Sequence, residues 1–331
     1  MNTIGTLFKL SIFGESHGNS VGIVIDGVPA GIPITREELE ADLSRRKSGA
    51  KGTTPRQEAD IPRIMSGVFE NHTTGAPILI LFENTNTRSK DYSFLLETPR
   101  PGHADFVAHK KFGGYEDYRG GGHFSGRITL GIVAAGVIAK KIIAPIIVKS
   151  TLIEAGGTTD IEKAVEKAIA EQDSIGGIVE TIATNMPIGL GEPFFGNIKA
   201  VLAHYIYSIP AIKGLEFGSG FAAARMKGTE HNDKFITVSG KTATNYAGGI
   251  NGGISNGNDL VFKVAVKPTS SIHATQHTMN MKTGQMTDLS VEGRHDTCIA
   301  LRIPVVVEAM TCLALADLVL QEQKFPRVVK S

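Results

Sequence analysis

Residues 127–141 are apolar almost all the way round a helical projection, and this segment limits the folds open to the chain more than any other. A helix without a polar face has to be buried. Gly131 and Gly136 allow neighbouring elements to pack closely against it. Residues 305–320 predict a second, mainly apolar helix near the end of the chain. We therefore expect a large core that contains helices.

Further helices and strands follow from local patterns. Alternating or short apolar runs predict strands at residues 6–13, 21–26, 77–82, 178–183, 235–239 and 260–266. Thr35 and Glu38 form a T-x-x-E capping box, which opens a helix that ends before Gly49. Residues 160–172 predict an amphipathic helix. Residues 84–126 show no sustained periodicity, and a connection of that length in a compact protein is usually functional.

The chain reads as one large α+β domain. It has 331 residues, of which 41% are hydrophobic, and no Pro- or Ser-rich linker divides it. The segments GIVIDGVPAGI from residue 22 and GIVETIATNMPIGL from residue 177 resemble each other weakly, which leaves an internal duplication open without establishing it. We expect a single domain over residues 1–331, with a site assembled from distant segments.

The overall composition excludes several classes of protein. Lys and Arg number 34 and Asp and Glu number 33, so the net charge is +1 and no global field attracts nucleic acid or a membrane surface. The N-terminus lacks the pattern of a secretory signal, and no stretch reaches the roughly 18 uninterrupted apolar residues of a membrane span. Cys298 and Cys312 form no CxxC pair. These features predict a cytoplasmic protein without nucleic-acid or membrane partners.

Three histidines lie in short runs of glycine, small polar and charged residues: His17 in GESHG, His103 in RPGHAD and His295 in GRHD. An imidazole on such a turn is exposed at a cleft, where its ordinary pKa of about 6.5 suits proton transfer at neutral pH. An arginine or a carboxylate accompanies each one. Taken singly, each motif is also compatible with a structural turn. Together they predict an acid/base site for an anionic ligand.

Two other segments could bind an anion. The glycine run at residues 120–122, followed by Arg127, reads either as an anion cradle or as the flexible entry to a helix. It lacks the GxxxxGK[ST] form of a P-loop, and no GxGxxG motif follows a strand. Lys267 and the hydroxyls of KPTSSI could hold a phosphate or the edge of a heterocycle, or could form a strand-end turn.

We expect no metal site. His273 and His277 are four residues apart, as in a helical pair of ligands, but their segment has no helical pattern. The sequence contains neither HExxH nor a cysteine cluster.

Taken together and in order, GESHG, RPGHAD, the glycine run ending in Arg127, GGIS, KPTSSI and GRHD resemble the chorismate synthase family over nearly the whole chain. The resemblance implies a lyase of the shikimate pathway and of aromatic amino-acid biosynthesis. With reduced FMN, it would convert 5-enolpyruvylshikimate 3-phosphate to chorismate and phosphate by a 1,4-anti elimination without net redox change. It also implies a β-α-β sandwich fold and a homotetramer.

The same resemblance implies catalytic roles for three residues. His17 would be the general acid near the departing phosphate, and His103 would lie by flavin N1 and influence its protonation. Asp296 would assist proton movement around flavin N5. The chemistry of the side chains agrees, because a leaving phosphate needs neutralisation and protonation, and two histidines in different surroundings can hold different pKa values.

Binding residues are implied as well. Arg46 and Arg127 would hold substrate anions, and Arg46 also matches a position assigned to NADPH in members that reduce their own flavin. Where many members read RRRPG, this chain reads RRKSG, so a second basic contact falls to Lys51 or is missing. Positions that match the FMN-lining residues of the family are His123, Phe124, Ser125, Pro210, Ala211, Gly252, Lys267, Pro268, Thr269, Ser270, Ser271 and Arg294.

Two departures from the family pattern affect function. HFSGR replaces the usual RSSAR, so His123 can stand in for the first arginine only when protonated. No appended flavin reductase domain is recognisable, so we expect an external flavin reductase to supply FMNH2, with NADPH as the indirect reductant. A flavin- or phosphate-binding protein without lyase activity is the alternative. A flavin-free phosphatase is a third reading, for which no nucleophile stands out.

Overall fold

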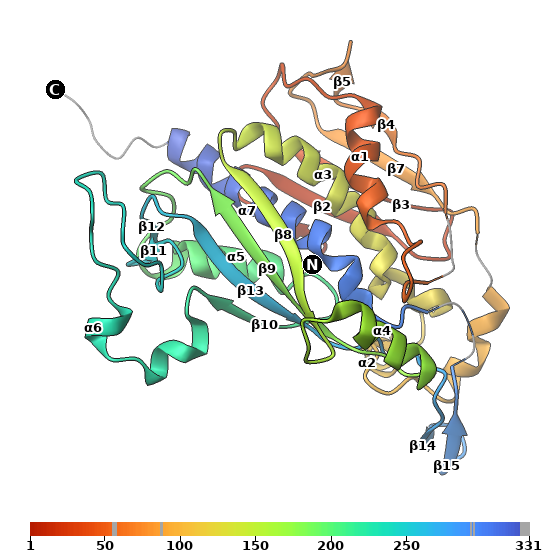
Figure 1. The fold of residues 1–331 in the computed structure, drawn as a ribbon. Coiled ribbons are helices and arrows are strands. Elements are labelled where there is room, and N and C mark those ends of the chain that lie inside the picture. Colours follow the sequence, from red (N-terminus) through yellow and green to blue (C-terminus); the bar gives the residue numbers. More distant parts are fainter. Residues whose placement is uncertain (55–57, 87–88, 292, 294, 325–331) are drawn as a thin grey trace.

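Two antiparallel sheets form the frame of the protein in the computed structural model, which describes residues 1–324 except 55–57, 87–88, 292 and 294 (Figure 1). The first sheet has the order β1-β2-β3-β7-β4 and the second the order β10-β13-β9-β8. The strands of the first are β1 (Thr3–Ile4), β2 (Lys9–Gly14), β3 (Ser20–Asp26), β4 (Arg63–Ser66) and β7 (Ile78–Glu83). Those of the second are β8 (Ile147–Ala155), β9 (Gly177–Thr184), β10 (Ile212–Phe217) and β13 (Leu260–Val266).

The two sheets share one strand order. When the short β1 is set aside and the four strands of each sheet are numbered in chain order, they lie side by side in the order 1-2-4-3 in both sheets. In the first sheet β7 lies between β3 and β4, and in the second β13 lies between β9 and β10. All neighbouring strands in both sheets are antiparallel. Smaller pairs are β5 (Val68–Phe69) with β6 (His72–Thr73), β11 (Ile250–Asn251) with β12 (Ile254–Ser255), and β14 (Gln276–Asn280) with β15 (Gln285–Leu289).

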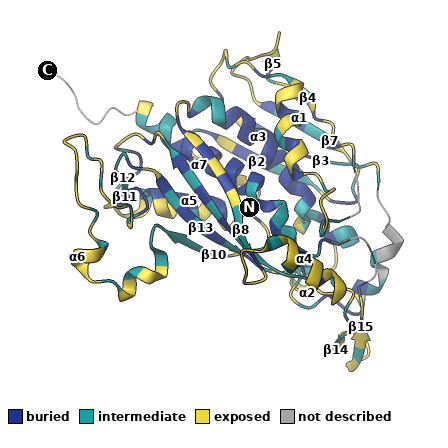
Figure 2. Ribbon diagram, in the orientation of Figure 1, coloured by how far each residue is buried: buried dark blue, intermediate teal, exposed yellow. Residues whose placement is uncertain are grey.

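Helices α3 (Thr129–Ile142) and α7 (Ile303–Lys324) connect the two sheets. They pack against each other, α3 also packs on β3 and β7, and α7 packs on β8 and β9. A Cβ atom at Gly136 would lie 2.5 Å from Cβ of Ala309, and one at Gly131 would lie 2.9 Å from Cβ of Ile23, so both contacts require glycine. The prediction of two buried helices is confirmed, and Figure 2 shows both mostly in dark blue.

Helix α7 is the one element among the described residues with the length and composition of a membrane span, over Ile303–Gln323. Of its most apolar 18-residue window, 83% is buried inside the protein. This is the environment of a core helix.

The remaining α-helices are α1 (Arg36–Arg46), α2 (Asp105–Phe112), α4 (Ile161–Ala170), α5 (Ile198–Ile206) and the short α6 (Gly228–His231). Helix α1 packs on α3 and α7, α5 packs on α7, and α4 packs on β8. The predicted capping box of α1 is confirmed, because the Thr35 hydroxyl accepts from the Glu38 amide and the Glu38 carboxylate accepts from the Thr35 amide. The predicted amphipathic helix is also confirmed as α4, with Asp160 as its N-cap.

Two expectations about local structure were wrong. Residues 235–239 form no strand, and only an isolated bridge joins Phe235 to Thr242. The side chains of Phe235, Ile236 and Val238 are exposed, so their β-forming composition has no sheet to join. Residues 84–126 are not irregular throughout, because they contain α2. That helix escaped detection because it buries only Ala108 and so has no apolar stripe.

A buried carboxylate holds α1, α3 and α7 together. Glu308 on α7 is 4% exposed and accepts hydrogen bonds from Nη1 and Nη2 of Arg45 at 2.7 and 2.9 Å. Nζ of Lys140 on α3 donates to it at 2.6 Å. Burial raises the pKa of Glu308, but the hydrogen bonds from Arg45 and Lys140 outweigh it and bring that pKa below its ordinary value.

Replacing Glu308 with glutamine is expected to lower the free energy of unfolding by about 2 kcal/mol at pH 7, because the three charge-assisted hydrogen bonds from Arg45 and Lys140 weaken or are lost. The depressed pKa means that the stabilisation by Glu308 is present above the ordinary carboxyl range and is lost as the pH falls through the folded-state pKa. Urea unfolding of both proteins at neutral and acidic pH measures this. The difference should shrink towards acid, and an equal difference at every pH would contradict the ionised clamp.

Candidate active site

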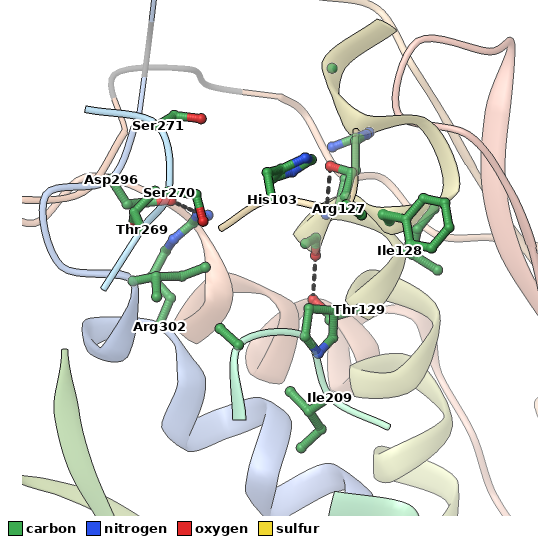
Figure 3. A pocket seen from close by; sticks show the side chains of 18 of the residues that line it. His103, Arg127, Ile128, Thr129, Ile209, Thr269, Ser270, Ser271, Asp296 and Arg302 are labelled. Carbon is green, nitrogen blue, oxygen red and sulfur yellow. Dashed lines mark hydrogen bonds and ion pairs between the residues drawn. The ribbon is translucent and has the colours of Figure 1, made fainter. Parts of the chain in front are cut away.

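A cavity of about 930 Å³ lies where several loops meet the start of α3 and of α7. Its walls come from segments far apart in the chain, as the sequence predicted. Among the residues predicted to bind or react, the following line it: Arg46, His103, His123, Phe124, Ser125, Arg127, Pro210, Ala211, Lys267, Pro268, Thr269, Ser270, Ser271 and Asp296. In Figure 3, His103 lies between the loop of Thr269–Ser271 on one side and Arg127 on the other.

The other predicted residues lie outside this lining. Lys51 forms an exposed ion pair with Glu166 at 2.5 Å, so its charge is already engaged away from the cavity. Gly252 is exposed in the β11–β12 turn and lies away from the cavity of its own chain. Arg294 lies outside the described residues.

His17 is buried beside the cavity and not in its lining. It follows β2 in the turn before β3, as expected, but it is only 7% exposed. Its ring packs edge-on against Tyr92, with ring centroids 5.3 Å apart, and Tyr92 does line the cavity. The expectation that the histidine of GESHG is exposed at the cleft is therefore wrong.

The glycine run passes between the two histidines. A Cβ atom at Gly120 would lie 2.2 Å from the His17 ring, and one at Gly121 would lie 3.3 Å from Cε1 of His103. Both glycines also have positive φ angles, +59° and +79°. The run does not cap α3, because a separate 3₁₀ turn, Gly126–Ile128, precedes that helix. Its close contacts instead keep His17 and His103 on either side of one backbone segment.

A cluster of arginines and carboxylates occupies one part of the wall. Nη1 of Arg127 donates to Oδ1 of Asp60 at 2.8 Å, and Nη1 of Arg46 lies 3.7 Å from the other oxygen of Asp60. Nη2 of Arg302 donates to Asp296 at 2.5 Å. Three arginines and two carboxylates leave one net positive charge in this cluster, which favours an anion in the cavity.

Arg46 is the most strongly perturbed member of this cluster. Its Nε donates to Oγ1 of Thr129 at 2.8 Å, and its Nη2 donates to the carbonyl of Gly126 at 3.0 Å. Burial, together with the charges of Arg302 and Arg127, lowers the pKa of Arg46 to about 9. It stays charged at pH 7, and a bound anion would relieve the repulsion among the guanidinium groups.

Hydroxyl groups and amines gather at another part of the wall. Nζ of Lys267 donates to the carbonyl of Gly102 at 2.8 Å and to Oγ of Ser270 at 2.6 Å. Burial and the nearby charge of Lys213 lower the pKa of Lys267. Lys213 also lines the cavity, so two ammonium groups face this side and suit a second anionic group.

His123 is fixed by two oxygens. Its Nδ1 lies 2.7 Å from the carbonyl oxygen of Gly14, and its Nε2 lies 3.1 Å from Oδ1 of Asn2. Phe124 beside it packs against Phe112 of α2, with ring centroids 6.4 Å apart. His123 and Phe124 thus join the cavity wall to the N-terminus and to α2.

Sequence reasoning missed several lining residues, among them Asp60, Tyr92, Lys213 and Arg302. Arg302 could have been found, because it is a charged residue next to a predicted apolar helix. Asp60 lies in a polar loop without any distinguishing pattern. Among the described residues, no group of three histidine, cysteine or acidic side chains is arranged to hold a metal ion.

Comparison with known proteins identifies the family. The model of the chorismate synthase family matches residues 8–320. The chain belongs to the chorismate synthase family. A chorismate synthase of Chitinophaga pinensis is 65% identical over 332 residues, and the match covers 100% of both chains. One from Dehalococcoides mccartyi is 48% identical over 361 residues, with 99% of each chain covered.

A solved chorismate synthase structure agrees with the fold. It has a TM-score of 0.73 and 25% sequence identity, and the match covers 96% of this chain and 93% of that one. The chain is thus a carbon–oxygen lyase of the shikimate pathway, which removes phosphate from 5-enolpyruvylshikimate 3-phosphate to give chorismate. The prediction of the family and of its activity is confirmed.

Proposed function

We propose that the 930 Å³ cavity binds reduced FMN and the phosphorylated substrate side by side, and that elimination takes place between its two cationic regions. The observation that supports this most is the presence of both regions in one cavity, with His103 between Arg127 and the Thr269–Ser271 loop (Figure 3). Its volume is near the upper end of ligand pockets, at about 1,000 Å³, which is suitable for two ligands.

The substrate is assigned to the arginine cluster. Its phosphate and carboxylates need several cations, and Arg46 and Arg127 offer guanidinium groups that can form bidentate hydrogen bonds. Both are buried, at 6% and 7% exposure, so an anion next to them is poorly screened by water. Lys51 pairs with Glu166 outside the cavity lining and has no part in this assignment.

The residues present suit FMN on the other side of the cavity. Lys267, Lys213 and the hydroxyls of residues 269–271 can receive a phosphate or the polar edge of a heterocycle, and Pro268 and Ala211 offer flat apolar surface. His123, Phe124, Ser125 and Pro210 also line the cavity, and their match to flavin-lining positions of the family assigns them to the same ligand. Reduced flavin, when bound, supplies electron density that helps the allylic phosphate to leave.

Three side chains move protons in this proposal. His17 would donate to the departing phosphate once its ring reaches the cavity past Gly120, and His103 would exchange a proton at the flavin. Asp296 assists removal of the substrate hydrogen. Its two oxygens accept from the Thr54 amide at 2.9 Å and from Arg302 at 2.5 Å, and each oxygen keeps a second lone pair that can take a proton.

We also propose a homotetramer in which the β11–β12 turn of a neighbouring subunit reaches the cavity. This would reconcile the exposed position of Gly252 with its match to a flavin-binding position. Exposed apolar side chains between residues 188 and 238 suit a subunit contact: Ile188, Phe194, Phe195, Phe221, Phe235, Ile236 and Val238.

The sandwich architecture, the internal duplication, the source of reduced flavin and the compartment are also part of the proposal. The packing of α3 and α7 between two sheets supports a β-α-β sandwich in one domain, and the shared strand order supports an internal duplication. An external reductase, with NADPH as its electron source, would supply FMNH2 in the cytoplasm. The two buried cysteines, Cys298 and Cys312, are free thiols, as suits a reducing compartment.

An anaerobic assay with photoreduced FMN tests the proposal. Chorismate and phosphate should form together in a 1:1 ratio only when reduced flavin is present. Formation of chorismate without flavin would contradict the cofactor assignment. Tight binding of FMN without turnover would instead indicate a flavin-binding protein.

A further inference from the structure

His103 is supported from behind by a buried ion pair. Its Nδ1 lies 2.6 Å from Oδ1 of Asp105. Nε and Nη2 of Arg100 donate to the two oxygens of Asp105 at 2.8 Å each, and the Arg100 amide adds a third hydrogen bond at 3.1 Å. The side chains of Arg100 and Asp105 are only 5% and 9% exposed, so water competes little with these contacts.

The contacts allow one arrangement of protons. Burial raises the pKa of Asp105, but the hydrogen bonds from Arg100 and His103 hold it well below its usual range. An ionised oxygen 2.6 Å from Nδ1 of His103 would face a lone pair unless Nδ1 is protonated. Nη2 of Arg100 also lies 3.0 Å from that Nδ1 and could donate to it if Nδ1 carried no proton. The lone pair of an unprotonated Nδ1 would then repel the nearer oxygen of Asp105. Nδ1 therefore donates to Asp105.

We propose that Asp105, oriented by Arg100, is a positioning residue that fixes His103 in the tautomer with the proton on Nδ1, so that Nε2 is the nitrogen that exchanges protons in the cavity. The inference rests on the proposed function, in which His103 is the histidine beside the flavin. Nη1 of Arg100 donates to Oγ of Ser271 at 2.8 Å, which ties the pair to the other cavity wall.

An asparagine at position 105 would reverse this hydrogen bond. Oδ2 accepts from both the amide and Nε of Arg100, so the amide oxygen of an asparagine would take that place. Its NH2 group would then replace Oδ1 and point donors at His103. The histidine would have to accept at Nδ1 and carry its proton on Nε2, which is the wrong tautomer for accepting a proton in the cavity.

The experiment combines NMR and kinetics on the full-length protein. In ¹⁵N-histidine spectra, with the His103 signals identified by their loss in His103→Ala, neutral His103 should be protonated on Nδ1 in the wild type and on Nε2 in Asp105→Asn. With photoreduced FMN, kcat of Asp105→Asn should fall about 10²-fold, while KM changes less than about twofold. Asp105→Glu keeps an ionised acceptor and should restore the wild-type tautomer and part of kcat.

Asp288→Asn is a matched control. Asp288 accepts from Nδ1 of His277 at 2.9 Å across the exposed β14–β15 pair, so the same change is made beside a histidine outside the cavity. It should leave both kcat and the His103 signals unchanged. An Nε2-protonated His103 in the wild type, or a wild-type kcat in Asp105→Asn, would overturn the inference. The tautomer of the wild type is measured without substrate, so its result is independent of whether the flavin assignment is correct.

Discussion

Replacing His17 with alanine is expected to lower kcat about 10³-fold, which is within the range for loss of a general acid. The departing phosphate would then leave without a proton from the protein. Because His17 is buried beside Gly120 and packs on Tyr92, its loss should affect turnover more than substrate binding, and KM should change little. Steady-state turnover with saturating reduced FMN measures both constants.

His72→Ala is the control for this variant, because His72 is an exposed histidine of β6 outside the cavity lining. His17→Gln keeps more of the side-chain volume and should be nearly as inactive as the alanine variant. Wild-type turnover in either His17 variant would remove this residue from the mechanism.

Replacing Arg127 with alanine is expected to reduce kcat/KM about 10³-fold, mainly through a higher KM for the phosphorylated substrate. The change removes a buried cation and also frees the carboxylate of Asp60, which then neutralises Arg46 at 3.7 Å. The cluster would pass from one net positive charge to none. Arg127→Lys keeps the charge but lacks the planar guanidinium group, so its kcat/KM should lie between those of the wild type and of Arg127→Ala.

Substrate titration at fixed reduced FMN measures this effect. Arg36→Ala is a matched control, because Arg36 forms an exposed ion pair with Glu40 outside the cavity. An unchanged KM in Arg127→Ala would contradict the assignment of the arginine cluster to the substrate.

Segments with a continuous or an alternating apolar pattern were predictable from the sequence, because their burial follows that pattern. Helix α3 is apolar all round and lies inside the protein, and β13 alternates buried and half-buried residues along its length. Helix α2 buries one residue and left no such pattern. The segment at residues 235–239 had the composition of a strand, but whether a strand forms depends on a partner that local sequence does not specify.

The candidate site was predictable where short motifs mark it and not where distant residues complete it. His103 and Arg127 lie in recognisable motifs, and both line the cavity. Asp60 contributes through a contact with Arg127, 67 positions away, which a single sequence does not reveal. Lys51 shows the opposite case. The motif left its role open, and in the structure its ammonium group pairs with Glu166 of α4 outside the cavity lining.

The close approach of α3 and α7 at Gly136 and Ala309 has a consequence for how this protein can be divided. Helix α3 packs on the first sheet, α7 packs on the second, and the two helices also pack on each other. A fragment ending near residue 145 would therefore expose to water the apolar face of α3 that α7 covers. Arg46, His103 and Arg127 precede that point, whereas Lys267 and Asp296 follow it. We therefore expect that the chain cannot be split near residue 145 into two fragments that fold independently. Each fragment would expose an apolar helix face, and neither would hold the complete set of reacting groups.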